Sequence, residues 1–156
     1  MSVSIQNRQK RVRLALRGLR RRAEAALASL RSGPESIGVV LVSDRTMRPL
    51  NRRFRGLDET TDVLSFSLRW PEGGGGEEGA YLGEVVISVE EAARQAEEDG
   101  ETLDEALDRL LIHGILHLKG HGHHTPREAA RMRRMERRLG EALGKMRLRV
   151  RGAGRR

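Results

Sequence analysis

The sequence contains no cysteine, only four Phe, Tyr and Trp residues in total, and no long apolar run. Without cysteine the chain can form no disulfide framework, no thiolate nucleophile and no cysteine-based zinc knuckle. No stretch approaches the roughly 18 uncharged apolar residues that a membrane span needs, and the polar first ten residues do not resemble a secretory signal. These absences predict a cytoplasmic protein that makes no membrane contact.

Charge is abundant and unevenly distributed along the 156 residues. Residues 1–31 carry nine Lys and Arg against one acid, and residues 126–156 carry twelve against three, whereas residues 32–125 carry nine against eighteen. Arginine supplies 27 of the 30 cations, and its forked guanidinium suits phosphate. A polyanion would therefore meet the two ends first, unless these arginines only cover solvated helix faces.

Apolar spacing and helix caps predict a mixture of strands and helices. Capping boxes mark three helix starts, at Ser88, Thr102 and Thr125, each followed by a glutamate three positions later. The predicted strands cover residues 3–5, 37–42, 63–68 and 81–88. The predicted helices open at residues 12, 43, 88, 102 and 125 and run to about residues 30, 54, 99, 118 and 143. Glycines at 73–76 predict a flexible loop.

This order of elements predicts an α+β fold, because strands and helices mix and two strands adjoin without a helix between them. We expect a single compact domain, with a small mixed β-sheet of about four strands packed with about five helices. Residues 1–145 form the predicted catalytic domain, and residues 146–156 a basic, flexible tail.

All five histidines fall between residues 113 and 124. His113 and His117 lie one turn apart on the inward face of the predicted central helix. Gly120 ends that helix and allows the chain to reverse, which brings His123 in the following loop back to the same point. The pattern H-x-x-x-H-x-x-G-x-x-H shares the spacing of the metzincin zinc site. Three imidazoles with one open position predict a catalytic metal, one Zn²⁺ per chain, although nickel also suits them.

One residue of the protease pattern is missing. Metzincins place a glutamate directly after the first histidine as the general base, and this position is Gly114 here. A metzincin-like metallopeptidase is therefore disfavoured.

Five segments resemble the motifs of one family, the YbeY family of bacterial rRNA maturation factors. His113 to His123 resembles its H-G-x-L-H-L-x-G-x-D-H signature. The other segments, in chain order, are Leu50 to Arg55 (L-N-x-x-[YF]-R), Thr61 to Phe66 (T-D-V-L-S-F), Leu82 to Ser88 (L-G-D-[IV]-x-I-S) and Met132 to Glu136 (M-x-x-x-E). The resemblance covers about residues 37–140, which is most of the chain.

The resemblance implies a metal-dependent, single-strand-specific endoribonuclease. Such an enzyme would act on precursor rRNA at the 3′ end of the small-subunit RNA, and in quality control of the ribosome. Its zinc ligands would be His113, His117 and His123. Arg55 would serve catalysis or RNA binding.

Two positions depart from the family signature. Gly122 replaces the aspartate before the last histidine, and His121 replaces a tyrosine that is often found one place earlier. A metal-bound histidine usually needs a hydrogen-bond acceptor that fixes its tautomer. His121, His124 or another carboxylate must then replace the aspartate. Asp62 is a further candidate for this supporting role, although it could simply cap a turn.

The predicted catalytic groups are Arg55 and a metal-bound water, with no protein general base assigned, because zinc can lower the pKa of such a water to about 7. Arg52, Arg53 and Ser65 are candidate RNA contacts. Alternatively, the two arginines belong to a solvated helix end and Ser65 lies on the polar face of a strand. With so few aromatic residues, recognition should rest mainly on phosphate and weaken as salt rises. The alternative from another class is a metal-stabilised ribosome-assembly factor with little activity.

Overall fold

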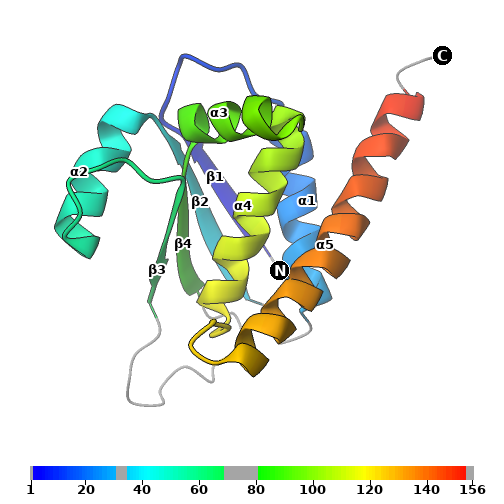
Figure 1. Ribbon diagram of the computed structural model, residues 1–156. Coiled ribbons are helices and arrows are strands. Elements are labelled where there is room, and N and C mark those ends of the chain that lie inside the picture. Colours follow the sequence, from blue (N-terminus) through cyan, green and yellow to red (C-terminus); the bar gives the residue numbers. More distant parts are fainter. Residues whose placement is uncertain (1, 31–34, 69–80, 154–156) are drawn as a thin grey trace.

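Four strands form one mixed sheet in the order β1-β2-β4-β3 (Figure 1). The strands are β1 (Ser2–Asn7), β2 (Ser36–Val42), β3 (Val63–Ser67) and β4 (Tyr81–Ser88). β1 and β4 both run parallel to β2, and β3 pairs with β4 antiparallel. β3 is therefore an edge strand, which leaves one of its sides open to other parts of the molecule.

Five helices accompany this sheet in the computed structural model, which describes residues 2–30, 35–68 and 81–153. They are α1 (Leu16–Ser29), α2 (Asp44–Arg55), α3 (Val89–Asp99), α4 (Leu103–Leu118) and α5 (Pro126–Ala153). The predicted α+β fold, with its small mixed sheet and its five helices in one compact domain, is confirmed. In the described part of the chain, no helix combines the length and the apolarity that crossing a bilayer requires.

The two faces of the sheet carry two separate apolar clusters, because side chains alternate along a strand. The main core lies between one face and helices α1, α3, α4 and α5, with α4 packed against β3, β4 and all three other helices. The residues of β2 and β4 on this face include Val39, Leu41, Val85 and Ile87. The other face carries a smaller cluster, in which Val40, Val42 and Val86 meet Leu64 of β3 and Met47 of α2.

Helix α4 begins and ends at the predicted positions. At its start the Thr102 hydroxyl accepts from the Glu105 amide (3.1 Å), and the Glu105 carboxylate accepts from the Thr102 amide (3.3 Å). At its end Gly120 has a φ of +91°, a left-handed conformation that glycine adopts at little cost. The amide of His121 then donates to the Leu116 carbonyl (3.0 Å), and the chain turns back. This turn delivers the following loop to the last turns of α4.

The outer helices differ from their predicted ends. The first helix begins at Leu16 instead of residue 12, because the Gln9 side chain bonds both the amide and the carbonyl of Val12 (2.9 Å each) and holds it in a turn. The last helix continues to Ala153 instead of residue 143, so residues 146–153 of the predicted tail are helical. Its apolar spacing extends to Met146, which packs on the main core, and Arg147 pairs with Asp108 of α4. The predicted glycine loop at 73–76 lies outside the described residues.

Candidate active site

Two histidines of α4 already point at one another. The Nε2 atoms of His113 and His117 lie 3.1 Å apart, and their ring centroids are separated by 4.5 Å. The ring of His123, carried by the loop after α4, lies 5.1 Å from the His117 ring and 5.9 Å from the His113 ring. Two nitrogens held about 2.0–2.1 Å from a tetrahedral zinc ion stand about 3.3 Å apart. The spacing of the His113–His117 pair therefore fits two ligands of one metal ion.

The ring of His123 is adjacent to this pair, but its nitrogens do not face the same point. Among the described residues no three donor side chains are closed around a single point. A tripod would therefore require His123, which is exposed, to turn a ring nitrogen toward the other two. Burial, followed by the neighbouring imidazoles of His113, His123 and His124, lowers the pKa of His117 to about 4. The ring is thus neutral at physiological pH, and neutral imidazole is the form that binds a metal.

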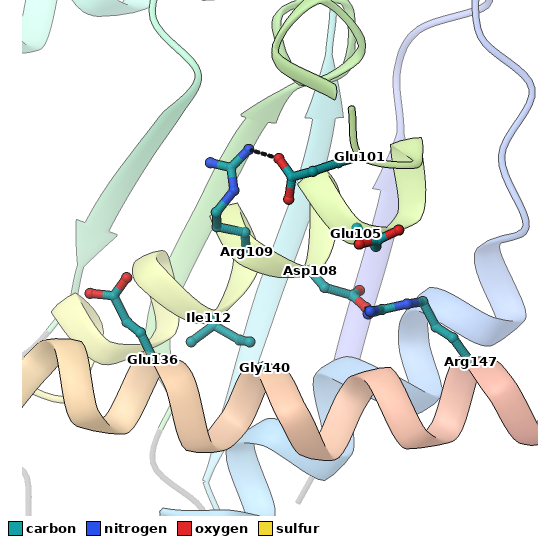
Figure 2. Close-up of a pocket in the computed structure, with 8 residues that line it drawn as sticks. All are labelled: Glu101, Glu105, Asp108, Arg109, Ile112, Glu136, Gly140 and Arg147. Atoms are coloured by element: carbon teal, nitrogen blue, oxygen red, sulfur yellow. Dashed lines mark hydrogen bonds and ion pairs between the residues drawn. The ribbon is translucent and has the colours of Figure 1, made fainter. Parts of the chain in front are cut away.

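A carboxylate that the sequence analysis assigned no role lies beside His113. Glu136 projects from α5 toward α4, next to a small cavity of about 250 Å³ between the two helices (Figure 2). Its Oε1 is 3.8 Å from Nδ1 of His113, which is longer than a direct hydrogen bond but within a small side-chain movement of one. Glu136 is the last residue of the M-x-x-x-E segment. That motif was the signal in the sequence that could have identified Glu136 as a site residue.

The three histidines line a groove of about 800 Å³, which we call the histidine groove. One wall is the edge strand β3, and one end is the last turn of α2. The lining residues are Phe54, Arg55, Asp62, Val63, Leu64, Ser65, Phe66, Ser67, Leu68, His113, His117, Leu118 and His123. Arg55 is exposed, and within the described residues its guanidinium makes no ion pair. An anion in this groove could therefore meet one free guanidinium and the imidazole cluster together.

The three candidates for a supporting role occupy different places. The Asp62 carboxylate lines the groove and accepts from the Val63 amide (2.7 Å) at the start of β3 and from the Gln95 side chain (3.0 Å). Its supporting role stays a prediction. His124 donates its amide to Glu128 (3.2 Å). His121 lines a second hollow together with His117, His123 and His124. Burial, followed by the cations Arg131 and Lys119, lowers its pKa.

Gly114 explains why the protease glutamate is missing. A Cβ added at Gly114 would lie 2.5 Å from a methyl carbon of Val85, so the position faces strand β4 and not the groove. The Ser65 hydroxyl donates to the Gly114 carbonyl (3.2 Å) and ties β3 to α4 at this point. A larger side chain at 114 would separate the helix from the sheet. The geometry thus argues against a metzincin-like general base here.

The two remaining basic candidates lie in the last turn of α2, beside Phe54 in the sequence. Arg52 and Arg53 are exposed in the last turn of α2, and the Arg53 guanidinium lies 5.8 Å from the centroid of the Phe54 ring. Their assignment as RNA contacts stays a prediction.

Comparison with known proteins agrees with the fold and with the motifs. The family model described as Endoribonuclease YbeY matches residues 4–144. The Endoribonuclease YbeY of Anaeromyxobacter sp. (strain Fw109-5) is 46% identical over 144 residues, which cover 92% of this chain and 73% of that protein. That of Pelotomaculum thermopropionicum is 42% identical over 153 residues, which cover 95% and 99%.

A solved structure also matches. The solution structure of TM1509 from Thermotoga maritima has a TM-score of 0.67 and 26% identity, and the match covers 94% of this chain and 93% of that one. The fold, the histidine-lined groove and these relatives define a small α+β nuclease, a hydrolase by reaction class. The chain belongs to the endoribonuclease YbeY family.

Proposed function

We propose that the protein is a zinc-dependent, single-strand-specific endoribonuclease of the cytoplasm. It acts on precursor rRNA, at the 3′ end of the small-subunit RNA, and in quality control of the ribosome. The observation that carries the proposal is the gathering of three imidazoles from α4 and its following loop in a groove that Arg55 also lines. The relatives named Endoribonuclease YbeY support the reaction class.

His113, His117 and His123 would hold the ion in this proposal. When bound, zinc would lower the pKa of a water to about 7 and polarise a phosphoryl oxygen. The chain prepares its ligands for this role in two ways. Burial keeps His117 neutral. A small side-chain movement would let the Glu136 carboxylate accept a hydrogen bond from the Nδ1–H of His113, which would leave Nε2 of that ring free as a ligand.

Arg55 is the proposed phosphate-binding catalytic group. A phosphodiester gathers negative charge as it approaches the transition state, and a guanidinium can stabilise that charge through two parallel hydrogen bonds. Arg55 is free to do so because no described carboxylate occupies it. Arg52 and Arg53 precede it in the same helical turn and would hold neighbouring phosphates, so binding should weaken as salt rises.

The test compares wild type with His117→Ala for metal content and for RNA cleavage. Elemental analysis should find one zinc per wild-type chain, and the protein should cut single-stranded RNA faster than a duplex of the same sequence. His117→Ala should lose both metal and cleavage. Freshly purified wild type that holds no metal and takes up none from added zinc would exclude the metal site.

The second candidate is a metal-stabilised assembly factor with little activity. One observation favours it: Gly122 leaves the position of the family aspartate without a side chain. The nearest atoms to a Cβ added there belong to His124 and Glu128, at 3.4 Å or more. Chelation separates the two candidates. An enzyme loses turnover and keeps its circular dichroism spectrum, whereas a protein whose metal is structural unfolds.

A further inference from the structure

Phe54 is an aromatic side chain at the groove that the fold leaves largely exposed. It keeps 56% of its surface accessible although it belongs to the apolar face of α2. That face begins with Met47, which is fully buried, and continues with Leu50, which packs on the smaller cluster. Phe54 follows Leu50 by four positions and so lies on the same face. The apolar face of α2 therefore extends beyond the smaller apolar cluster on which this helix packs.

Among the described residues, two side chains lie close to the Phe54 ring: Phe66 and Arg53, whose guanidinium is 5.8 Å from the ring centroid. Phe54 and Phe66 make an edge-to-face contact, with ring centroids 4.7 Å apart and ring planes at 70°. Phe66 is partly buried against the smaller cluster at the edge strand β3. Phe66 meets the Phe54 ring only at an edge, and Phe54 keeps 56% of its surface accessible although the Arg53 guanidinium lies near the ring. A ring held in this way loses little freedom when a flat group stacks on it.

Phe54 lies between two hollows of different character. On one side is the histidine groove, with Arg55 and the three imidazoles. On the other is a hollow of about 330 Å³, which we call the apolar hollow. Its lining is Val40, Val42, Leu50 and Val86, with Gln6, Arg8, Thr46 and Glu84 as polar members and the two Phe rings as the remainder. An apolar surface with a few hydrogen-bonding groups is suited to a flat heteroaromatic ligand.

We propose that Phe54 is the stacking platform for one nucleobase of the single-stranded substrate, seated over the apolar hollow. This inference rests on the proposed function and adds to it the position of a base. The phosphate next to that base would lie on the groove side of the ring, beside Arg55. A duplex keeps its bases stacked on one another, so only an unpaired base can be seated in this way. Phe54 thus provides a physical basis for single-strand specificity.

Charge favours RNA over an apolar peptide as the occupant. Three arginines, Arg52, Arg53 and Arg55, share the last turn of α2 with Phe54. A partner that places a ring on Phe54 and anionic groups on both sides of it matches this arrangement. A strand of nucleic acid provides a phosphate on each side of every base.

The experiment measures the affinity of the zinc-loaded protein for a fluorescein-labelled single-stranded RNA, with intact RNA verified after each titration. Phe54→Leu keeps an apolar contact with Phe66 but removes the aromatic face. It should weaken binding about 10-fold, within the range measured for loss of one base–aromatic stack. The dependence of log Kd on log salt should not change, because no phosphate contact is lost. Phe54→Trp should restore the wild-type affinity.

The matched control is Leu57→Ala, which removes another exposed apolar side chain just beyond α2 and should bind as wild type does. A scan of abasic sites along the RNA gives the second readout. At one position the abasic substitution should weaken wild type about 10-fold and have no further effect on Phe54→Leu, because both changes remove the same stack.

Three results separate the possible failures. Wild type that neither binds nor cuts RNA would refute the proposed function itself. Wild type that binds, with Phe54→Leu indistinguishable from it, would refute only the stacking platform. Two further results would assign Phe54 a purely structural role and overturn the inference. In the first, Phe54→Leu lowers the affinity by the same factor for every abasic RNA. In the second, Phe54→Trp binds RNA as weakly as Phe54→Leu does.

Discussion

His113 turns its two ring nitrogens toward different partners: Nε2 lies 3.1 Å from Nε2 of His117, and Nδ1 lies 3.8 Å from Oε1 of Glu136. The first nitrogen belongs to the imidazole cluster, and the second faces a carboxylate carried by another helix. This division matches the way in which metal-bound histidines are commonly supported, with one nitrogen on the metal and the other on an acceptor.

Glu136→Gln should therefore weaken zinc binding by about 10-fold, because the amide is a poorer acceptor for the Nδ1 proton and no longer raises the basicity of the ring. Competition with a chromogenic chelator gives the affinity. Glu141→Gln, an exposed change on the same helix, is the matched control and should bind zinc as wild type does. Equal affinities for all three proteins would mean that Glu136 does not support His113.

Arg55→Ala should slow cleavage of single-stranded RNA by about 100-fold, the scale on which the loss of one transition-state hydrogen-bond donor is felt. Zinc content and melting temperature should be unchanged, since Arg55 is exposed and makes no ion pair with the described residues. Arg45→Ala, an exposed arginine at the other end of α2, controls for the loss of charge. If both variants slow cleavage equally, the effect is one of net charge and Arg55 has no special role.

Gly114→Ala should destabilise the fold by about 1–3 kcal/mol, because its Cβ would stand 2.5 Å from a methyl carbon of Val85 and the core would be overpacked. Urea unfolding followed by circular dichroism measures this. Gly140→Ala in α5 is the control: nothing lies within 4 Å of its Cβ, and alanine there should add up to about 1 kcal/mol. Val85→Ala should relieve the clash in the double variant, and a Gly114→Ala protein as stable as wild type would refute the packing argument.

The lowered pKa of Asp44 determines how this residue should make the stability of the fold depend on pH. Burial pushes the pKa of this carboxyl up, but hydrogen bonds from Ser88, Arg94 and Thr60, with the charge of Arg94, outweigh it and leave the pKa below its ordinary value of 3.8. A carboxyl whose pKa is lower in the folded state stabilises the protein above pH 3.8, and this stabilisation is lost as pH falls through the folded pKa.

Asp44→Asn should accordingly lower the free energy of unfolding at pH 7 and flatten its decline below about pH 4. Chemical denaturation at a series of pH values provides the comparison. Asp99→Asn, an exposed carboxyl at the end of α3, should leave both the stability and its pH dependence unchanged. A decline below pH 4 that is as steep in Asp44→Asn as in wild type would show that the lowered pKa contributes nothing.

Local rules settled much of the fold in advance. The capping box at Thr102 and the left-handed Gly120 bound α4 at the ends that the sequence predicts, because both depend on neighbours within one turn. The prediction was wrong where a distant or unusual contact intervened. The Gln9 side chain hydrogen-bonds the backbone of Val12, so the first helix begins later than predicted. The last helix packs on the main core as far as Met146, so it ends later than predicted.

The sequence by itself determined the histidine cluster, since His113, His117 and His123 lie on one helix and its adjoining turn and their proximity follows from helical geometry. Only the tertiary structure decided what surrounds them. It placed β3 at the edge of the sheet, brought Glu136 of α5 to within 3.8 Å of His113, and packed Gly114 on β4. It also left Phe54 exposed between two hollows. These relationships join residues that are far apart in the chain, and the packing of helices on a sheet, which no local spacing encodes, sets them.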